Sequence, residues 1–228
     1  MSSMSPAALT RGAAPSHGAP FRGFHDEEAS PFFRAPGHPP EETWELSIDC
    51  LAGILETLDA AGPIEISTEL LCAWHREIFG ALFPEHAGRL RSLRHGQREH
   101  VYFDIRTCDY RGTNPRKLPR RLVKICTDFN TTAAAIRASR TADTFDAIHA
   151  ATRLYAKVLR AHPFLDGNLR VTIVALNAAL LALGFPQVQF KDLELHDDLL
   201  GIAFAGKHDP YRPLAEHIAE IVGARSHA

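Results

Sequence analysis

Hydrophobic residues recur along most of this chain at spacings of three and four positions, which is the period of one face of an α-helix. The first run predicts an amphipathic helix that starts near Glu41 and stops near Gly62-Pro63; its apolar positions are Trp44, Ile48, Leu51, Leu55 and Leu58. The second run, from Leu70 to Phe79, predicts a helix that Ser67 or Thr68 caps and that ends at Gly80. The same period predicts further helices from Pro119 through Phe129 and near residues 144–161, 168–183, 193–205 and 213–222.

β-Branched and aromatic residues dominate one short segment, Val101–Ile105, and turn residues follow it at Gly112, Asn114 and Pro115. This pattern is typical of a short β-hairpin. The predicted fold class is therefore all-α, a mainly helical bundle with one small β-hairpin. The apolar stretch from Ile173 to Leu183 is expected to lie in its core.

The first forty residues differ from the rest, because they are rich in Pro and Ser and poor in aliphatic side chains. Such a segment cannot bury enough apolar surface to offset the entropy lost on ordering, so residues 1–40 are predicted to be a disordered leader. It lacks the continuous apolar core of a secretory signal peptide, and a non-Sec secretion signal stays open as an alternative to an inert tail. Residues 41–228 are expected to form one helical domain.

The charges nearly balance across the 228 residues, with 25 Lys and Arg against 27 Asp and Glu and a net charge of −2. This balance argues against nucleic acid or an anionic membrane as the main partner, since both favour a strong basic surplus. The best candidate for a membrane span, Val171–Phe185, is shorter than the roughly 20 residues required and is interpreted as a buried helix. The four cysteines are too scattered for a zinc site, and a reducing cytoplasmic location fits them.

Four kinds of polar group converge in the segment between two apolar helices, residues 162–170. His162 titrates near neutrality and suits a general base, and Asp166 is an oxygen ligand suited to Mg²⁺. Gly167 and Asn168 tolerate backbone twists that point N–H groups outward at a helix N-terminus, where Arg170 can bind a phosphate. Together they indicate a phosphoryl- or nucleotidyl-transfer site, although Asp-Gly-Asn also occurs in ordinary turns and helix caps.

The nine residues His-Pro-Phe-Leu-Asp-Gly-Asn-Leu-Arg from His162 to Arg170 resemble the signature loop of the Fic domain, His-Pro-Phe-x-Asp/Glu-Gly-Asn-Gly-Arg-x-x-Arg. The resemblance extends from about Glu41 to Val222. It includes the helix Leu71–Phe79 and the turn Ala87-Gly88-Arg89-Leu90-Arg91, which is similar to the Ala-Gly-x-x-Arg turn of the family. The segment Asp209–Leu214 resembles the start of the closing helix of the family.

The resemblance implies a protein adenylyltransferase, which moves AMP from Mg-ATP to a Ser, Thr or Tyr hydroxyl of another protein. In that role His162 takes the proton of the attacking hydroxyl and Asp166 holds Mg²⁺. The backbone of Gly167, Asn168 and Leu169, with the Asn168 side chain, is expected to cradle a phosphate, and Arg170 to contact the leaving part. Phe164 is expected to anchor the loop. The hairpin is expected to act as a target-positioning flap through Tyr102, Phe103, Asp104 and Ile105.

Two positions depart from the pattern of the family: Leu169 replaces the second Gly and Ile173 replaces the second Arg. Three functions therefore stay open: a slower AMP transferase, a transferase with another donor (another nucleoside monophosphate or phosphocholine), or a degenerate, non-catalytic interaction module. Transfer of a terminal phosphate, as in one branch of the superfamily, is a further alternative.

The inhibitory motif of many family members contains a Glu followed by Gly or Asn, and this chain has no such pair. Inhibition is therefore expected either to come from a separate antitoxin-like protein or to be missing. A toxin or an effector delivered to another cell by a non-Sec route fits this expectation.

Other polar residues are expected to have structural roles. His75 and His149 lie on partly apolar helix faces and are predicted to be satisfied core or surface groups rather than ligands. The cluster Arg89, Arg91, Arg94 and Arg98 is predicted to form a solvated surface that faces the target. A second basic cluster either guides an acidic target or lines a helix N-terminus; it comprises Arg116, Lys117, Arg120 and Arg121.

Overall fold

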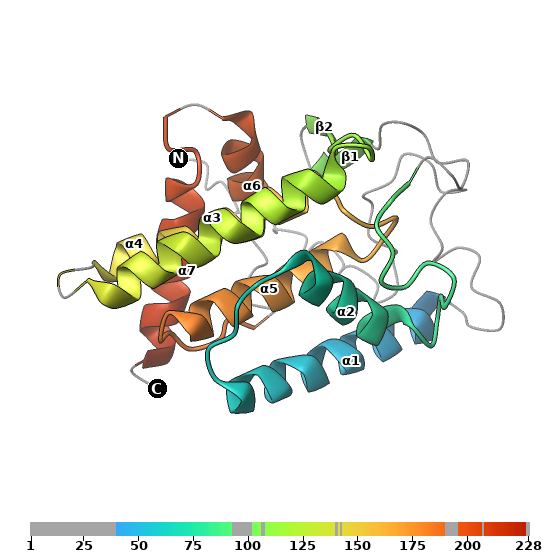
Figure 1. Ribbon diagram of the computed structural model, residues 1–228, viewed down its shortest axis with the longest axis horizontal. Coiled ribbons are helices and arrows are strands. Elements are labelled where there is room, and N and C mark those ends of the chain that lie inside the picture. Colours follow the sequence, from blue (N-terminus) through green and yellow to red (C-terminus); the bar gives the residue numbers. More distant parts are fainter. Residues whose placement is uncertain are drawn as a thin grey trace, which may run out of the picture.

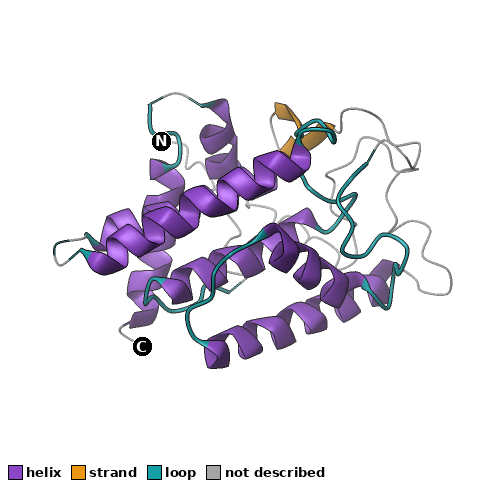
Figure 2. Ribbon diagram, viewed as in Figure 1, coloured by secondary structure: helices purple, strands orange, loops and turns teal. Residues whose placement is uncertain are grey.

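The computed structural model describes residues 40–92, 102–105, 108–139, 141, 143–189, 196–206 and 208–226. Within these residues the chain folds into seven helices and one pair of strands (Figures 1 and 2). The elements are α1 (Pro40–Ala61), α2 (Thr68–Phe79), β1 (Tyr102–Ile105), β2 (Cys108–Arg111), α3 (Leu118–Ala138), α4 (Thr144–Ala161), α5 (Asn168–Ala182), α6 (His196–Ala205) and α7 (Arg212–Ser226). The predicted all-α fold class is confirmed. The predicted leader lies outside the described residues except for Pro40, and the single domain over 41–228 stays a prediction.

Polar side chains define where several helices begin. The hydroxyl of Ser67 accepts a hydrogen bond of 3.1 Å from the backbone N–H of Leu70, so Ser67 and not Thr68 caps α2. Asp143 caps α4 in the same way, by accepting 3.1 Å from the N–H of Phe145. These caps satisfy donors that have no partner inside the helix.

Helix α5 is the centre of the hydrophobic core. It is buried on nearly all sides, and residues 173–176 and 178–180 are at most 1% exposed. Helices α1, α2 and α4 pack against it, so α5 lies between the α1–α2 pair and α4 (Figure 1). The expectation that the apolar stretch from Ile173 forms the core is confirmed for the residues that face these helices. The polar Asn177 is satisfied within the core, since it donates to and accepts from the backbone of Val188 at 3.1 and 2.7 Å.

Helix α4 also packs against α3 and α7. His149 joins α4 to the segment before α7, because its Nε2 lies 2.8 Å from Oδ1 of Asp209. The prediction that His149 is a satisfied group is confirmed. Helix α7 starts at Arg212, inside the segment that resembles the start of the family's closing helix.

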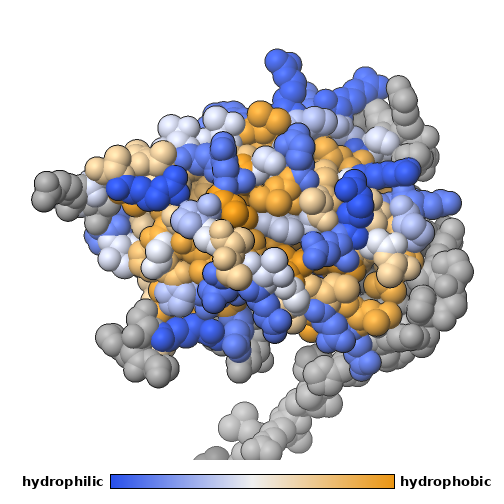
Figure 3. All heavy atoms as spheres, turned by 60° about the horizontal axis from the view of Figure 1, so that its bottom comes forward, coloured by the Kyte–Doolittle hydropathy of each residue, from blue (hydrophilic) through white to orange (hydrophobic). Residues whose placement is uncertain are grey.

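Strands β1 and β2 are antiparallel, and their register pairs Tyr102 with Arg111 and Ile105 with Cys108. The hairpin lies beside the N-terminal end of α3 (Figure 1). On the face turned forward in Figure 3, hydrophobic residues show across the middle of the described surface, and hydrophilic residues lie among and around them. In the part of the chain that the structure describes, no helix combines the length and apolarity that crossing a membrane requires.

Candidate functional site

The loop between α4 and α5 begins with a sharp reversal of the chain at His162. This residue has a left-handed backbone, with φ 51° and ψ 64°, and its N–H donates to the carbonyls of Val158 and Leu159. A left-handed residue commonly ends a helix, but a non-glycine residue there requires support from its surroundings. The side chain of His162 is 1% exposed.

The side chain of Asn168 closes the loop. Its Oδ1 accepts 2.9 Å from the N–H of Phe164, and its Nδ2 donates 3.0 Å to the carbonyl of the same residue. The resemblance assigned this side chain to the phosphate cradle. Because its acceptor and one of its donors bind Phe164, its contribution in this structure is to fix the shape of the loop.

His75 on α2 holds the loop through a hydrogen bond and a ring contact. Its Nδ1 accepts 2.9 Å from the N–H of Gly88, so Nε2 carries the proton and donates 3.1 Å to the carbonyl of Asp166. Its ring stacks on that of Phe164, with centroids 4.0 Å apart. Burial lowers the pKa of His75 to about 4, which keeps the ring neutral. His75 is thus the satisfied core group that was predicted, and Phe164, fully buried, packs as the expected anchor.

Gly167 is required by its backbone and by its packing. It has φ 69° and ψ 9°, and a Cβ added to it would lie 2.1 Å from Cε2 of Phe79. Its carbonyl accepts from the N–H of Val171 and starts α5, and its N–H donates 2.6 Å to Oδ1 of Asp166. The Asp166 carboxylate therefore lies at the N-terminus of α5, where the helix dipole favours a negative charge.

Arg170 lies in the first turn of α5, close to Asp166. Its side chain is 4% exposed, and its guanidinium carbon lies 5.6 Å from the centre of the Phe79 ring. Burial lowers the pKa of Arg170 to about 10, and the charge of Asp166 opposes this shift, so the two side chains attract each other. The negative carboxylate of Asp166 and the positive guanidinium of Arg170 therefore lie together at the N-terminus of α5.

Arg91 belongs to the site, which corrects the prediction that it forms a solvated surface. It is 2% exposed. Its Nε donates to the carbonyl of His162, and its backbone N–H donates 2.9 Å to the carbonyl of Pro163. Its Nη2 donates to the carbonyls of Thr113 and Ala161 at 2.9 and 3.3 Å. The similarity of Ala87–Arg91 to the Ala-Gly-x-x-Arg turn was the signal that pointed to it. The rest of the cluster is split, since Arg89 is exposed and Arg94 and Arg98 lie outside the described residues.

The environment of His162 favours the neutral imidazole. Burial lowers the pKa of His162 well below its usual range, and the positive charge of Arg91 lowers it further. A neutral imidazole can accept a proton, which is the state that a general base requires.

The segment that follows the hairpin is hydrogen-bonded to the end of α4 and to Arg91. The N–H of Thr113 donates 3.1 Å to the carbonyl of Ala161, and Arg91 binds the carbonyl of Thr113. The predicted flap residues Tyr102, Phe103, Asp104 and Ile105 form β1. The chain that follows the hairpin is thereby held at the end of α4, next to His162.

The two positions that depart from the family pattern differ in burial. Leu169 is half-buried and packs against the core, and its carbonyl accepts 2.9 Å from the hydroxyl of Thr172. Ile173 is 0% exposed and belongs to the core. The position at which the family has its second Arg is therefore an apolar core position in this chain.

The described residues contain no group of three or more His, Cys, Asp or Glu side chains that could hold a metal ion. Within the loop, Asp166 is the one side chain with a carboxylate.

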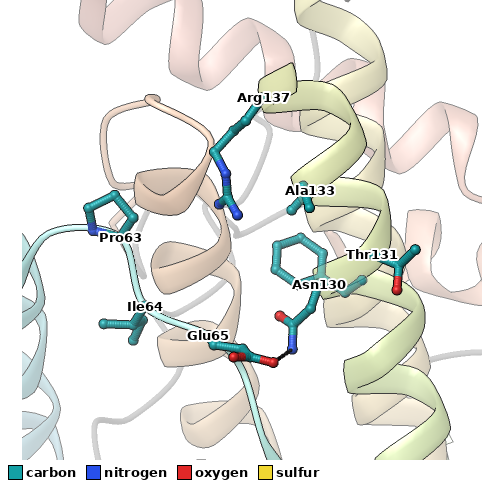
Figure 4. A pocket seen from close by; sticks show the side chains of 9 residues that line it. Pro63, Ile64, Glu65, Asn130, Thr131, Ala133 and Arg137 are labelled. Carbon is teal, nitrogen blue, oxygen red and sulfur yellow. Dashed lines mark hydrogen bonds between the residues drawn. The ribbon is translucent and has the colours of Figure 1, made fainter. Parts of the chain in front are cut away.

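A pocket of about 470 Å³ lies between residues 63–65 and the C-terminal half of α3 (Figure 4). Asn130 lies on its wall, where it donates 3.3 Å to Glu65. None of the lining residues of this pocket belongs to the loop.

Comparison with known proteins gives one family and one fold. The sequence profile of the Fic/DOC family matches residues 65–180, slightly more than half of the 228 residues. Comparison with curated proteins gives no match.

Solved structures with this fold include Fic-1 from C. elegans, at 24% identity and a TM-score of 0.56 over 84% of this chain and 54% of that chain. The N-terminal Fic domain of a VirB-translocated effector from Bartonella sp. 1-1C is 14% identical, with a TM-score of 0.64 over 82% of this chain and 88% of that one. A VirB-translocated effector from Bartonella tribocorum with bound AMPPNP is 17% identical, with a TM-score of 0.58 over 78% and 86%. The chain thus spans about half the length of the C. elegans structure, and these identities show a shared fold.

Proposed function

The chain belongs to the Fic/DOC family, and we propose that it transfers AMP from ATP to a Ser, Thr or Tyr hydroxyl of a target protein. One observation carries the proposal: His162, Asp166 and Arg170 lie within nine residues, from the end of α4 to the first turn of α5, with His162 held neutral by burial and by Arg91. The AMPPNP in the related Bartonella tribocorum structure supports a nucleotide as co-substrate.

The proton transfer is assigned to His162. Its neutral ring accepts the proton of the target hydroxyl while the hydroxyl oxygen attacks the α-phosphorus of ATP. The bond between that phosphorus and the bridging oxygen breaks, and pyrophosphate leaves. The products are an AMP ester on the target and an imidazolium, which then returns its proton to solvent.

The phosphates are assigned to the N-terminus of α5. Backbone N–H groups and the helix dipole attract anions there, and Arg170 adds a cation. Mg²⁺ in nucleotide sites is commonly held by one or two carboxylates together with phosphate oxygens, so the single carboxylate of Asp166 fits it. A Mg²⁺ bound at Asp166 would neutralise charge on the phosphates. His162, Asp166 and Arg170 have little contact with solvent, so nucleotide binding requires the atoms around them to rearrange.

The target is assigned to the hairpin. An extended segment can add as a strand to an exposed sheet edge through main-chain hydrogen bonds, which sets its position along the strand without requiring a particular sequence. The bonds among Thr113, Ala161 and Arg91 would hold such a segment near His162. A separate antitoxin-like inhibitor is part of the same proposal, because no Glu in the chain is followed by Gly or Asn.

One observation favours a second donor. Ile173 replaces the second Arg of the Fic pattern, a cation that the resemblance assigns to the distal phosphate, and in this chain the position is a fully buried apolar one. A donor that places less charge there, such as CDP-choline, avoids this loss, and the group transferred would then be phosphocholine.

The test uses the full chain with Mg²⁺ and ATP labelled at the α-phosphate, added to a cell lysate. We expect label on a protein, and a mass gain of one AMP group by intact-mass analysis. His162→Ala should abolish the label, whereas His149→Ala, within the helix that precedes His162, should retain it. Label that persists in His162→Ala contradicts the assigned base. A mass gain of one phosphate or one phosphocholine, with CDP-choline supplied in parallel, selects the corresponding alternative.

A further inference from the structure

Basic side chains line the surface where α3 and α4 pack side by side. On α3, Arg121 and Lys124 are one turn apart and both are exposed. On α4, the exposed Arg153 and the half-buried Lys157 are four residues apart and so lie on one face. We call these four residues the α3–α4 basic surface.

The carboxylate of Asp128 lies among these cations. Both of its oxygens are 3.0 Å from Nζ of Lys124. Asp128 also lines a shallow hollow of about 30 Å³ between the helices together with Arg153 and Lys157. Three of the four cations, Lys124, Arg153 and Lys157, thus act on the Asp128 carboxylate, and these five side chains together carry an excess of positive charge although the whole chain has a net charge of −2.

The charges are close enough to perturb one another. Burial lowers the pKa of Lys157, and Arg153, Arg121 and Lys124 lower it further, whereas Asp128 opposes the shift. The bond from Lys124 lowers the pKa of Asp128, and Lys157 and Arg153 add to this. Like charges held this close repel each other in the free protein, so an added anion would relieve the repulsion.

The position of the surface connects it to the candidate site. Lys157 lies one turn before the end of α4, which leads directly to His162. Arg121 lies in the first turn of α3, which follows the hairpin (Figure 1). The hydrogen bond from Thr113 to Ala161 joins the segment before α3 to the last residue of α4. A chain that lies along the surface therefore reaches the hairpin and the loop without crossing the core.

We infer that the α3–α4 basic surface binds an acidic segment of the protein that the candidate site modifies. The identity of that partner as the target rests on the proposed function, but the binding itself does not. The compact cluster of four cations suits a short acidic peptide segment, and the net charge of −2 argues against a long polyanion such as DNA.

The probe is a fluorescein-labelled peptide of ten glutamates, titrated with the full chain and followed by fluorescence anisotropy without nucleotide. We expect saturable binding at about 50 mM NaCl that weakens at least about tenfold at about 200 mM, because salt screens exposed charges. A peptide of ten lysines should not bind. Equal binding of the two peptides, or no binding of either at low salt, overturns the inference.

Three variants locate the binding. The double variant Arg153→Glu, Lys157→Glu should weaken peptide binding at least about tenfold, since it removes two attractions and adds two repulsions. The control Arg137→Glu, Arg225→Glu changes the net charge equally at other places and should bind as the parent does. Asp128→Asn should bind about 2–5-fold more tightly, the range for one exposed charge, and loss of folding cannot produce such a gain.

Failure of this inference is distinguishable from failure of the proposed function. Peptide binding that survives in the double variant contradicts the inference that the α3–α4 basic surface binds the peptide, even if AMP labelling succeeds. Peptide binding that follows the expected pattern without any AMP labelling leaves the surface standing and removes the proposed reaction. Tighter binding of a duplex DNA than of the glutamate peptide contradicts the assignment of a protein partner.

Discussion

The guanidinium of Arg91 donates from Nε to the backbone carbonyl of His162, seventy-one positions further along the chain. This contact places a buried cation at the C-terminal end of α4, where the helix dipole is negative. It also fixes the left-handed backbone of His162 and lowers the pKa of its ring. Arg91 therefore holds the backbone of the proposed base and adds its charge to the larger effect of burial, which keeps the ring of His162 neutral.

Replacement of Arg91 should separate its charge from its hydrogen bonds. Arg91→Gln removes the charge, so the pKa of His162 should rise. The acidic limb of the pH–rate profile should then move to higher pH, because a protonated ring cannot accept a proton. Arg91→Lys keeps the positive charge but loses the guanidinium that donates to several carbonyls at once, so the acidic limb of the pH–rate profile should stay at its original pH. Both variants should lose about 2–4 kcal/mol of stability in urea unfolding, since buried carbonyls lose donors. Identical limbs in the two variants would contradict an electrostatic role.

His75 should make the fold sensitive to acid. Its pKa is about 4 in the folded chain and about 6.5 when unfolded, so its contribution to stability is complete above pH 6.5 and is lost as the pH falls toward 4. Between pH 7.5 and 5 the parent should lose about 2 kcal/mol through this group. His75→Gln, whose amide can still donate and accept, should show a correspondingly smaller loss in urea unfolding at the two pH values. An equal loss in both proteins would assign the acid sensitivity to other groups.

Gly167→Ala should test the contact with Phe79. The added Cβ meets the ring at 2.1 Å and the backbone has φ 69°, so we expect a loss of about 2–4 kcal/mol from strain and overpacking. Gly62 has φ 73° with nothing within 4 Å, and Gly62→Ala should therefore lose only about 1 kcal/mol in the same thermal unfolding assay. Partial rescue of Gly167→Ala by Phe79→Leu would identify the ring as the cause. Equal losses at the two glycines would leave only backbone strain.

Ile173→Arg restores the residue type of the family and should harm the fold. Position 173 is fully buried, so an unpaired guanidinium there should cost about 3–5 kcal/mol. Calorimetry should find no gain in ATP affinity, and Ile173→Met should keep most of the stability because its volume is similar. A stable Arg variant that binds ATP more tightly would show that this position reaches the nucleotide.

Local residue patterns were sufficient to predict the helices and the loop. Periodic apolar residues located α1 and α2, because a helix at the surface buries one face, whereas α5 was recognised by its nearly continuous apolar stretch, which is typical of a helix buried on all sides. His162, Asp166, Gly167 and Arg170 were identified together because they lie within nine residues of one another, and a loop that short between two helices keeps its side chains close.

Contacts between distant segments could not be obtained in this way. The sequence shows Arg91 as one of several basic residues, and only packing of its turn against the end of α4 removes it from water and directs it at His162. The tautomer of His75 likewise depends on Gly88 and Asp166, which lie on either side of it in space and far apart in the chain.

The sequence alone therefore determined the helical class, the loop and its chemical groups, since these follow from neighbours along the chain. Only the tertiary structure decided which groups are buried, which are charged, and what holds them. Burial and charge depend on the environment that other segments create, and that environment exists only once the helices have packed.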